Sequence, residues 1–195
     1  MDTLTAVLKV THITTAILMA WPFYALVVVN QRVRLGPPLG DRVDTYMENI
    51  IKNRTIPCFV FQLTALVTGI WLVLDMGAGW SLLIENPRLA FKLVGLVGIG
   101  GLLGYVHANL QPRIDGLFAQ GGEGPISAEL GADISTLRTQ RKRMASVCLF
   151  VVLAEAMLGV QVWMPFSWWL NLVLVAAIAA LTTRAYRTDT PYGWA

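Results

Sequence analysis

Apolar blocks of about 20 residues constrain the fold of this 195-residue chain more than any other feature. An α-helix of that length crosses the ~30 Å of hydrocarbon in a bilayer. The sequence predicts five such helices, at about residues 4–30, 56–76, 89–110, 144–164 and 167–185. Charged residues make up 14% of the chain, whereas a soluble domain has about 25%. We therefore predict an all-α, polytopic membrane helical bundle, a single integral membrane domain over residues 1–195 surrounded by lipid bilayer.

Basic residues gather in two of the predicted loops. The loop at 31–55 contains five of them and the loop at 111–143 another five, whereas Arg88 is the only one in the loops of the opposite side. Lysine and arginine are enriched in cytoplasmic loops. We therefore predict an N-terminus outside, a cytoplasmic C-terminus and insertion in a bacterial cytoplasmic (inner) membrane. The formal net charge of +3 comes from these loops, so we expect no nucleic-acid partner.

The two basic loops also contain helix signals. The segment after Asp41 spaces Met47 and Ile51 along one helical face, which predicts a helix lying in the membrane interface. In the second loop, Ser127 precedes a helical pattern and predicts the start of a polar helix that leads into the fourth span.

The third predicted span contains five glycines after Lys92. Glycine costs a helix about 1 kcal/mol relative to alanine, so this density indicates that a backbone or a flat ligand approaches the helix closely. Gly95, Gly98 and Gly101 would leave room for a flat ring below Lys92. Alternatively, Gly100 and Gly104 form a GxxxG pattern, which is typical of helix packing.

The chain has two histidines, His12 and His107, and both lie in predicted spans. Two membrane histidines can hold a b-type haem between them. From the helical rise, His12 lies roughly 8 Å above the membrane midplane and His107 about 12 Å below it. The two ligands of one iron atom must lie about 4 Å apart, so these histidines do not share one. His107, near the predicted cytoplasmic boundary, needs no special role there, or alternatively binds a second cofactor or a quinone head group.

Lys92 lies about 10 Å above the same midplane, close to the level of His12. A lysine at this depth can extend its ammonium group to the membrane surface. Alternatively, the ammonium group pairs with an anion such as a haem propionate, beside His12 as the metal ligand, because neutral imidazole binds iron well. Met19 is two turns from His12 and offers a soft copper site as a further alternative.

Glu155 lies almost at the centre of the fourth predicted span, where a bare carboxylate is costly. We interpret it as a catalytic group in a proton relay or a quinone contact, or alternatively as a neutral acid hydrogen-bonded to a neighbour such as Gln62. Cys58 and Cys148 are interpreted as small core residues, because no metal-ligand spacing such as CxxC occurs.

Two segments in the first 110 residues resemble a superfamily of small membrane proteins that contains the copper-resistance D-like proteins and the HemJ-type protoporphyrinogen oxidases. They are LKVTHITTAILMAW, with an early histidine, and RLAFKLVGLVGIGGLLGYVH, with a lysine before an apolar run. The resemblance implies bound b-type haem, with His12 and Lys92 as the functional pair. The Asn-Glu-x-Pro motif of the oxidases is missing from the fourth span, which has Ala154-Glu155-Ala156, and a fifth helix follows.

Together these observations predict a b-type haem protein that transfers electrons within the membrane. With so little soluble mass the chain needs a partner for its electrons, so we expect it to be a subunit of a larger respiratory or photosynthetic complex. The first alternative is a cofactor-free subunit that assembles with other membrane proteins. The second is a HemJ-like porphyrinogen oxidase, and the sequence leaves open whether the protein is an enzyme.

Overall fold

The computed structural model describes residues 3–30, 42–52, 54–75, 77, 79–122 and 126–187. Its helices are α1 (Thr3–Asn30), α2 (Arg42–Lys52), α3 (Thr55–Asp75), α4 (Leu82–Glu85), α5 (Pro87–Tyr105), the π-helix η2 (Val106–Leu110), α6 (Gln111–Gly121), α7 (Ala128–Gln161) and α8 (Trp168–Arg187). No strand occurs in these residues. Five helical stretches among them, one each on α1, α3, α5, α7 and α8, are long and apolar enough to span a membrane. The predicted all-α, multi-pass fold is confirmed.

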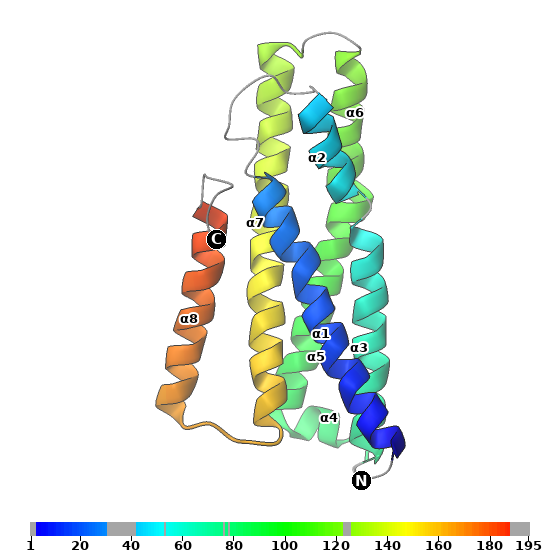
Figure 1. The fold of residues 1–195 in the computed structure, drawn as a ribbon, viewed down its shortest axis with the longest axis vertical. Helices are drawn as coiled ribbons and strands as arrows, with labels where there is room; N and C mark the ends of the chain where they lie inside the picture. The colour runs from blue at the N-terminus through cyan, green and yellow to red at the C-terminus, as the bar shows by residue number, and fades with distance from the viewer. Residues whose placement is uncertain are drawn as a thin grey trace.

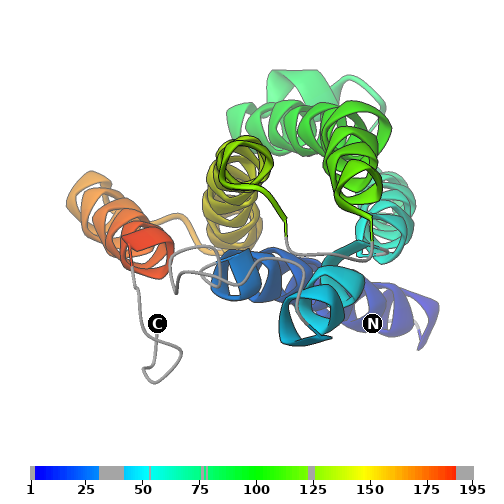
Figure 2. The same cartoon turned by 90° about the horizontal axis from the view of Figure 1, so that it is seen from above.

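The helices α1, α3, α5 and α7 form a bundle in which α1 packs against α3 and α7, and α5 packs against α7. Figures 1 and 2 show α8 beside this bundle, where it contacts mainly α7. In Figure 1 the N-terminus and α4 lie at one end of the bundle, and α2, α6 and the first turns of α7 lie at the other. We call these the outer end and the inner end, following the topology predicted from the sequence.

An apolar layer fills the middle of the bundle. Its buried residues come from all four bundle helices and are Met19, Phe23, Cys58, Ile99, Leu103, Cys148, Leu149 and Val152. Both cysteines are free thiols within this layer, which agrees with their interpretation as core residues. Truncating a buried apolar side chain to alanine typically lowers the stability of a protein by several kcal/mol, about 2–5 for a leucine or methionine. Burial of these side chains is therefore the main packing contribution to stability in this layer.

The third span does not end where the sequence predicted. The π-helix η2 ends at the predicted boundary, Leu110, but the chain continues as α6 to Gly121. Pro112 lacks an N–H and its ring would collide with the carbonyl group four residues earlier in a regular α-helix. The wider π turn, in which the Gln111 N–H bonds to the Val106 carbonyl oxygen, accommodates the proline without breaking the helix.

The helix α7 begins at the predicted place and carries the chain from the second loop into the fourth span. Ser127 caps it, because its hydroxyl oxygen accepts a hydrogen bond from the Leu130 N–H at 3.3 Å. The prediction of a polar helix leading into the span is confirmed. As a result, α6 and the first half of α7 form a helical hairpin at the inner end (Figure 1).

The helix α2 is present as predicted, but its packing differs from that of an interfacial helix. Its buried side chains include Asp44 and Glu48, which are 1% and 8% exposed. Arg138 of α7 binds both oxygens of Asp44, at 2.8 and 3.1 Å. Arg141 of α7 binds both oxygens of Glu48 and also donates to the amide oxygen of Gln111. We call these five residues the inner-end network; it holds α2 against the α6–α7 hairpin.

Candidate functional site

His12 of α1 is anchored to α3 in the outer half of the bundle. Its Nδ1 lies 3.0 Å from the hydroxyl oxygen of Thr68, which is itself buried. The adjacent residue, Gly69, leaves space for the ring, because a Cβ atom there would lie only 3.1 Å from the imidazole Cε1. The imidazole also forms a hydrogen bond with the backbone of Ala65. It therefore packs directly against the α3 backbone, half-buried and anchored by Thr68 and Ala65.

Lys92 of α5 points into the bundle at the same level. Its side chain is half-buried, and its Nζ lies 3.1 Å from where a Cβ atom on Gly159 of α7 would be. Its charge interacts with both His12 and Glu155. The sequence prediction that Lys92 lies at the depth of His12 agrees with this placement.

Glu155 of α7 completes the group. It is 8% exposed, and its Oε1 occupies the space that a Cβ atom on Gly95 of α5 would take. Oε1 is buried and has no hydrogen-bond partner among the described residues. The alternative prediction of a bond to Gln62 is wrong, because the Gln62 amide donates instead to the Leu96 carbonyl oxygen at 3.3 Å.

We call His12, Thr68, Lys92 and Glu155 the outer cluster; each comes from a different bundle helix. The apolar layer begins directly below it, since Val152 is one turn along α7 from Glu155. Below the apolar layer lies the inner-end network. In the part of the chain that the structure describes, the charged groups of the outer cluster and of the inner-end network are thus separated by a layer that contains no charged side chain.

His107 is not part of the outer cluster. It is exposed on η2, with its Nδ1 2.8 Å from the Thr55 hydroxyl oxygen and its ring edge-on to Phe59 at 6.2 Å between centroids. Thr55 and Thr68 are 13 residues apart on α3, or about 20 Å by the helical rise. The two histidines lie at opposite ends of α3, as the depth argument predicted.

The structure separates the three glycines that were predicted to leave room for a ring, because Gly101, like Gly98, has no other atom within 4 Å of a Cβ position. Gly95 faces Glu155, whereas Gly98 is exposed, and a Cβ atom added to it would meet no other atom within 4 Å. In the GxxxG pair, Gly100 faces Gln62 at 3.6 Å and Gly104 has nothing within 4 Å. The glycine-rich helix therefore has one face that admits side chains of its neighbours and another that is open.

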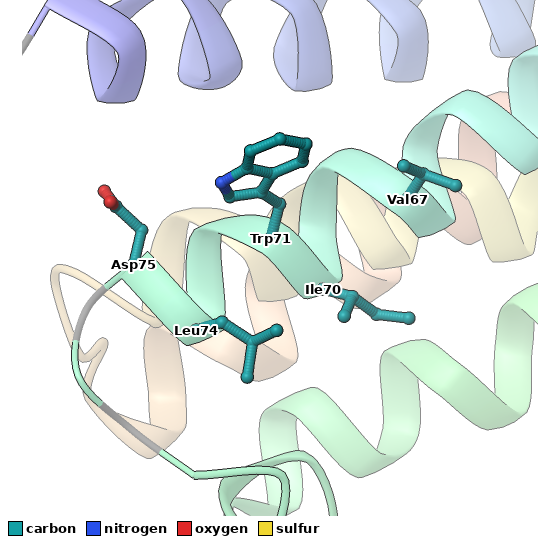
Figure 3. A pocket seen from close by; sticks show the side chains of 5 residues that line it. All are labelled: Val67, Ile70, Trp71, Leu74 and Asp75. Atoms are coloured by element: carbon teal, nitrogen blue, oxygen red, sulfur yellow. The ribbon is translucent and has the colours of Figure 1, made fainter.

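A hollow of about 470 Å³ lies elsewhere on the surface, near the outer end of α3. Figure 3 shows its lining side chains, Val67, Ile70, Trp71, Leu74 and Asp75, all of which come from α3. Asp75 is the only charged residue among them, and its carboxylate accepts a hydrogen bond from Thr5. We assign no site to this hollow, because an apolar surface on one membrane helix is ordinarily covered by lipid.

Sequence reasoning did not identify Thr68, Gly69 or Gly159 as parts of the site. Thr64 and Thr68, one turn apart in an apolar span, are a usable signal, because hydroxyl groups at membrane depth bond to neighbouring helices or to their own backbone. Glycines carry less information, since they are frequent in membrane helices.

Among the described residues, no group of three or more His, Cys, Asp or Glu side chains is placed to hold a metal ion. A metal bound at His12 would therefore depend mainly on ligands that a cofactor supplies. Comparisons with family models, with curated proteins and with solved structures find no match for this chain.

Proposed function

We propose that this membrane protein binds b-type haem in its outer half, with His12 as the axial ligand, and takes part in electron transfer. The observation that carries the proposal is the outer cluster, in which separate helices contribute an anchored imidazole, an ammonium group that interacts electrostatically with it, and a buried carboxyl group. Such groups are expensive inside a membrane and are usually retained for a role.

The side-chain chemistry of the outer cluster suits this cofactor. His12 uses Nδ1 for Thr68, so its Nε2 would bind the iron, as in haem proteins with a single proximal histidine. Lys92 would hold a haem propionate. Its ammonium group interacts electrostatically with the His12 imidazole, and an ammonium group suits a carboxylate. When bound, the haem supplies one-electron redox chemistry, which the side chains of the cluster lack.

Glu155 is the proton-handling group in this proposal. Its buried Oε1 is an acceptor that nothing in the described protein satisfies. The apolar layer separates it from the inner end, so it would exchange protons with the outer side of the membrane. We further propose a quinone as electron donor or acceptor, because such a molecule diffuses in the bilayer and its head group could contact Glu155.

We place the protein in a bacterial inner membrane as a subunit of a respiratory or photosynthetic complex. The bulk of the described chain lies in its five apolar helices and the hairpin beside them. Partner subunits would therefore supply the remaining electron carriers.

The reduced-minus-oxidised visible spectrum of the purified protein tests the haem assignment. We expect a b-type band in the wild-type protein and its loss in His12→Ala. His107→Ala is the matched control, because His107 lies at the other end of α3, and it should keep the band. Absence of the band from the wild-type protein contradicts haem binding; its persistence in His12→Ala contradicts the ligand assignment alone.

A cofactor-free assembly subunit is the second candidate, favoured by the open glycine face of α5. Gly98, Gly101 and Gly104 have nothing within 4 Å of a Cβ position, so they do not serve packing among the described residues. Membrane helices use such small residues to approach each other closely. Under this proposal, replacing Gly98 and Gly101 by leucine abolishes co-purification of partner subunits, and no wild-type preparation shows a b-type band.

A further inference from the structure

The hydrogen bonds of the Thr68 hydroxyl group determine whether it donates to His12 or accepts from it. Its Oγ1 lies 2.6 Å from the Thr64 carbonyl oxygen and 3.3 Å from the Ala65 carbonyl oxygen. A carbonyl oxygen can only accept, and a threonine hydroxyl has a single proton. The proton of Thr68 is therefore directed to the α3 backbone, a common arrangement for threonine inside a helix.

The proton on His12 follows from this direction. The Thr68 oxygen, having given its proton to α3, can only accept from the imidazole Nδ1 at 3.0 Å. Nδ1 must then carry a hydrogen atom, and in the neutral ring Nε2 is left with a free lone pair. A ring with the opposite tautomer would place two lone pairs against each other at this distance.

We infer that Thr68 is a positioning residue that fixes the tautomer and ring orientation of His12, with Nε2 as the atom available to a metal or proton donor. Gly69 supports the same orientation, because its missing side chain lets Cε1 approach the α3 backbone. Histidines that bind metals usually donate their other N–H to a protein acceptor, and this contact sets ring orientation and ligand basicity. The inference deepens the proposed function and rests on it only for the metal.

Nitrogen NMR of the full chain, labelled with ¹⁵N-histidine and prepared in detergent without haem, tests the tautomer directly. The chain has only two histidines, so the variant His107→Gln assigns the signals of His12. We expect a protonated Nδ1 and an unprotonated Nε2 in the wild-type protein. In Thr68→Val the hydroxyl acceptor is lost while the Ala65 backbone contact remains, so the change measures the share of Thr68 alone. The ratio of the two tautomers should shift about fivefold toward Nε2–H, the effect of one net hydrogen bond.

Two further variants separate positioning from packing. Thr68→Ser keeps the hydroxyl group and should restore the wild-type signals. Thr64→Val is the matched control, because Thr64 takes part only through its backbone carbonyl and its hydroxyl bonds to Val60. An Nε2–H tautomer in the wild-type protein, or unchanged His12 signals in Thr68→Val, overturns the inference.

The haem-bound protein gives a second measurement that separates the two proposals. If a b-type band is present, Thr68→Val should weaken haem binding by about 10–100-fold and Thr68→Ser should restore it. If Thr68→Val binds haem with the same affinity as the wild-type protein, the positioning role is overturned and the proposed function stands. The expected NMR result, combined with no b-type band in wild-type protein purified with haem available, supports the tautomer and contradicts haem binding.

Discussion

Replacing Arg141 by methionine is expected to lower the free energy of unfolding by about 3–5 kcal/mol, the usual cost of breaking a buried ion pair from one side. Arg141 is fully buried, and its guanidinium group binds Glu48 through Nη1 at 2.5 Å and Nη2 at 2.9 Å. It also donates to Gln111 at 2.6 Å. Methionine fills a similar volume but leaves the buried Glu48 carboxylate with Arg138 as its remaining arginine partner.

Reversible unfolding of the purified protein in mixed detergent micelles, followed by circular dichroism, measures this change. Arg143→Met is the matched control, because Arg143 is exposed on the same helix and should change stability by less than about 0.5 kcal/mol. The double variant Arg141→Met/Glu48→Leu removes both charges and should be more stable than Arg141→Met alone. A cost below about 1 kcal/mol for Arg141→Met would show that the network contributes as weakly as surface ion pairs do.

The parts of the fold that sequence reasoning predicted depend on local pattern and on the bilayer. Span length is set by the thickness of the hydrocarbon, so all five spans could be placed from apolar blocks alone. The Ser127 cap is a contact between residues three apart, and such contacts are visible in sequence. The common level of His12 and Lys92 follows from helical rise and alternating helix direction.

The inner-end network could not be predicted, because its partners come from different loops. Arg138 and Arg141 were informative for topology as basic loop residues, yet they are buried against Asp44 and Glu48, 94 and 93 residues away in the chain. The rotation of each helix about its axis decides such pairings, and hydrophobic pattern constrains that rotation weakly when both lipid and core are apolar. The apolar face around Met47 and Ile51 was therefore interpreted as that of a helix lying in the membrane interface.

The same lack of information about rotation explains the errors in the candidate site. Gly95 and Gly98 are three residues apart, so they differ by about 60° in direction around the helix axis. That angle is enough to put Gly95 against Glu155 and Gly98 on the open face. The sequence analysis expected a flat ring beside Gly95, whereas the group that lies there is the Glu155 carboxyl group of the same chain.

Gly95→Ala is consequently expected to destabilise the protein by about 1–3 kcal/mol, the usual cost of overpacking. The added methyl group would overlap the Glu155 Oε1 and come within 3.2 Å of Val151 Cγ1. Both neighbours belong to α7, so either the carboxyl group rotates away from Lys92 or α5 and α7 move apart. Unfolding in detergent measures the stability, and the b-type band expected from the proposed function measures any change in haem binding.

Gly98→Ala is the matched control on the same helix, since a methyl group there meets no atom within 4 Å. It should be neutral or stabilising by up to about 1 kcal/mol, because alanine is the better helix former. The double variant Gly95→Ala/Glu155→Ala removes the group that causes the overlap and should regain most of the lost stability. Equal effects of Gly95→Ala and Gly98→Ala would contradict the close packing of Glu155 on α5, because only that contact distinguishes the two positions.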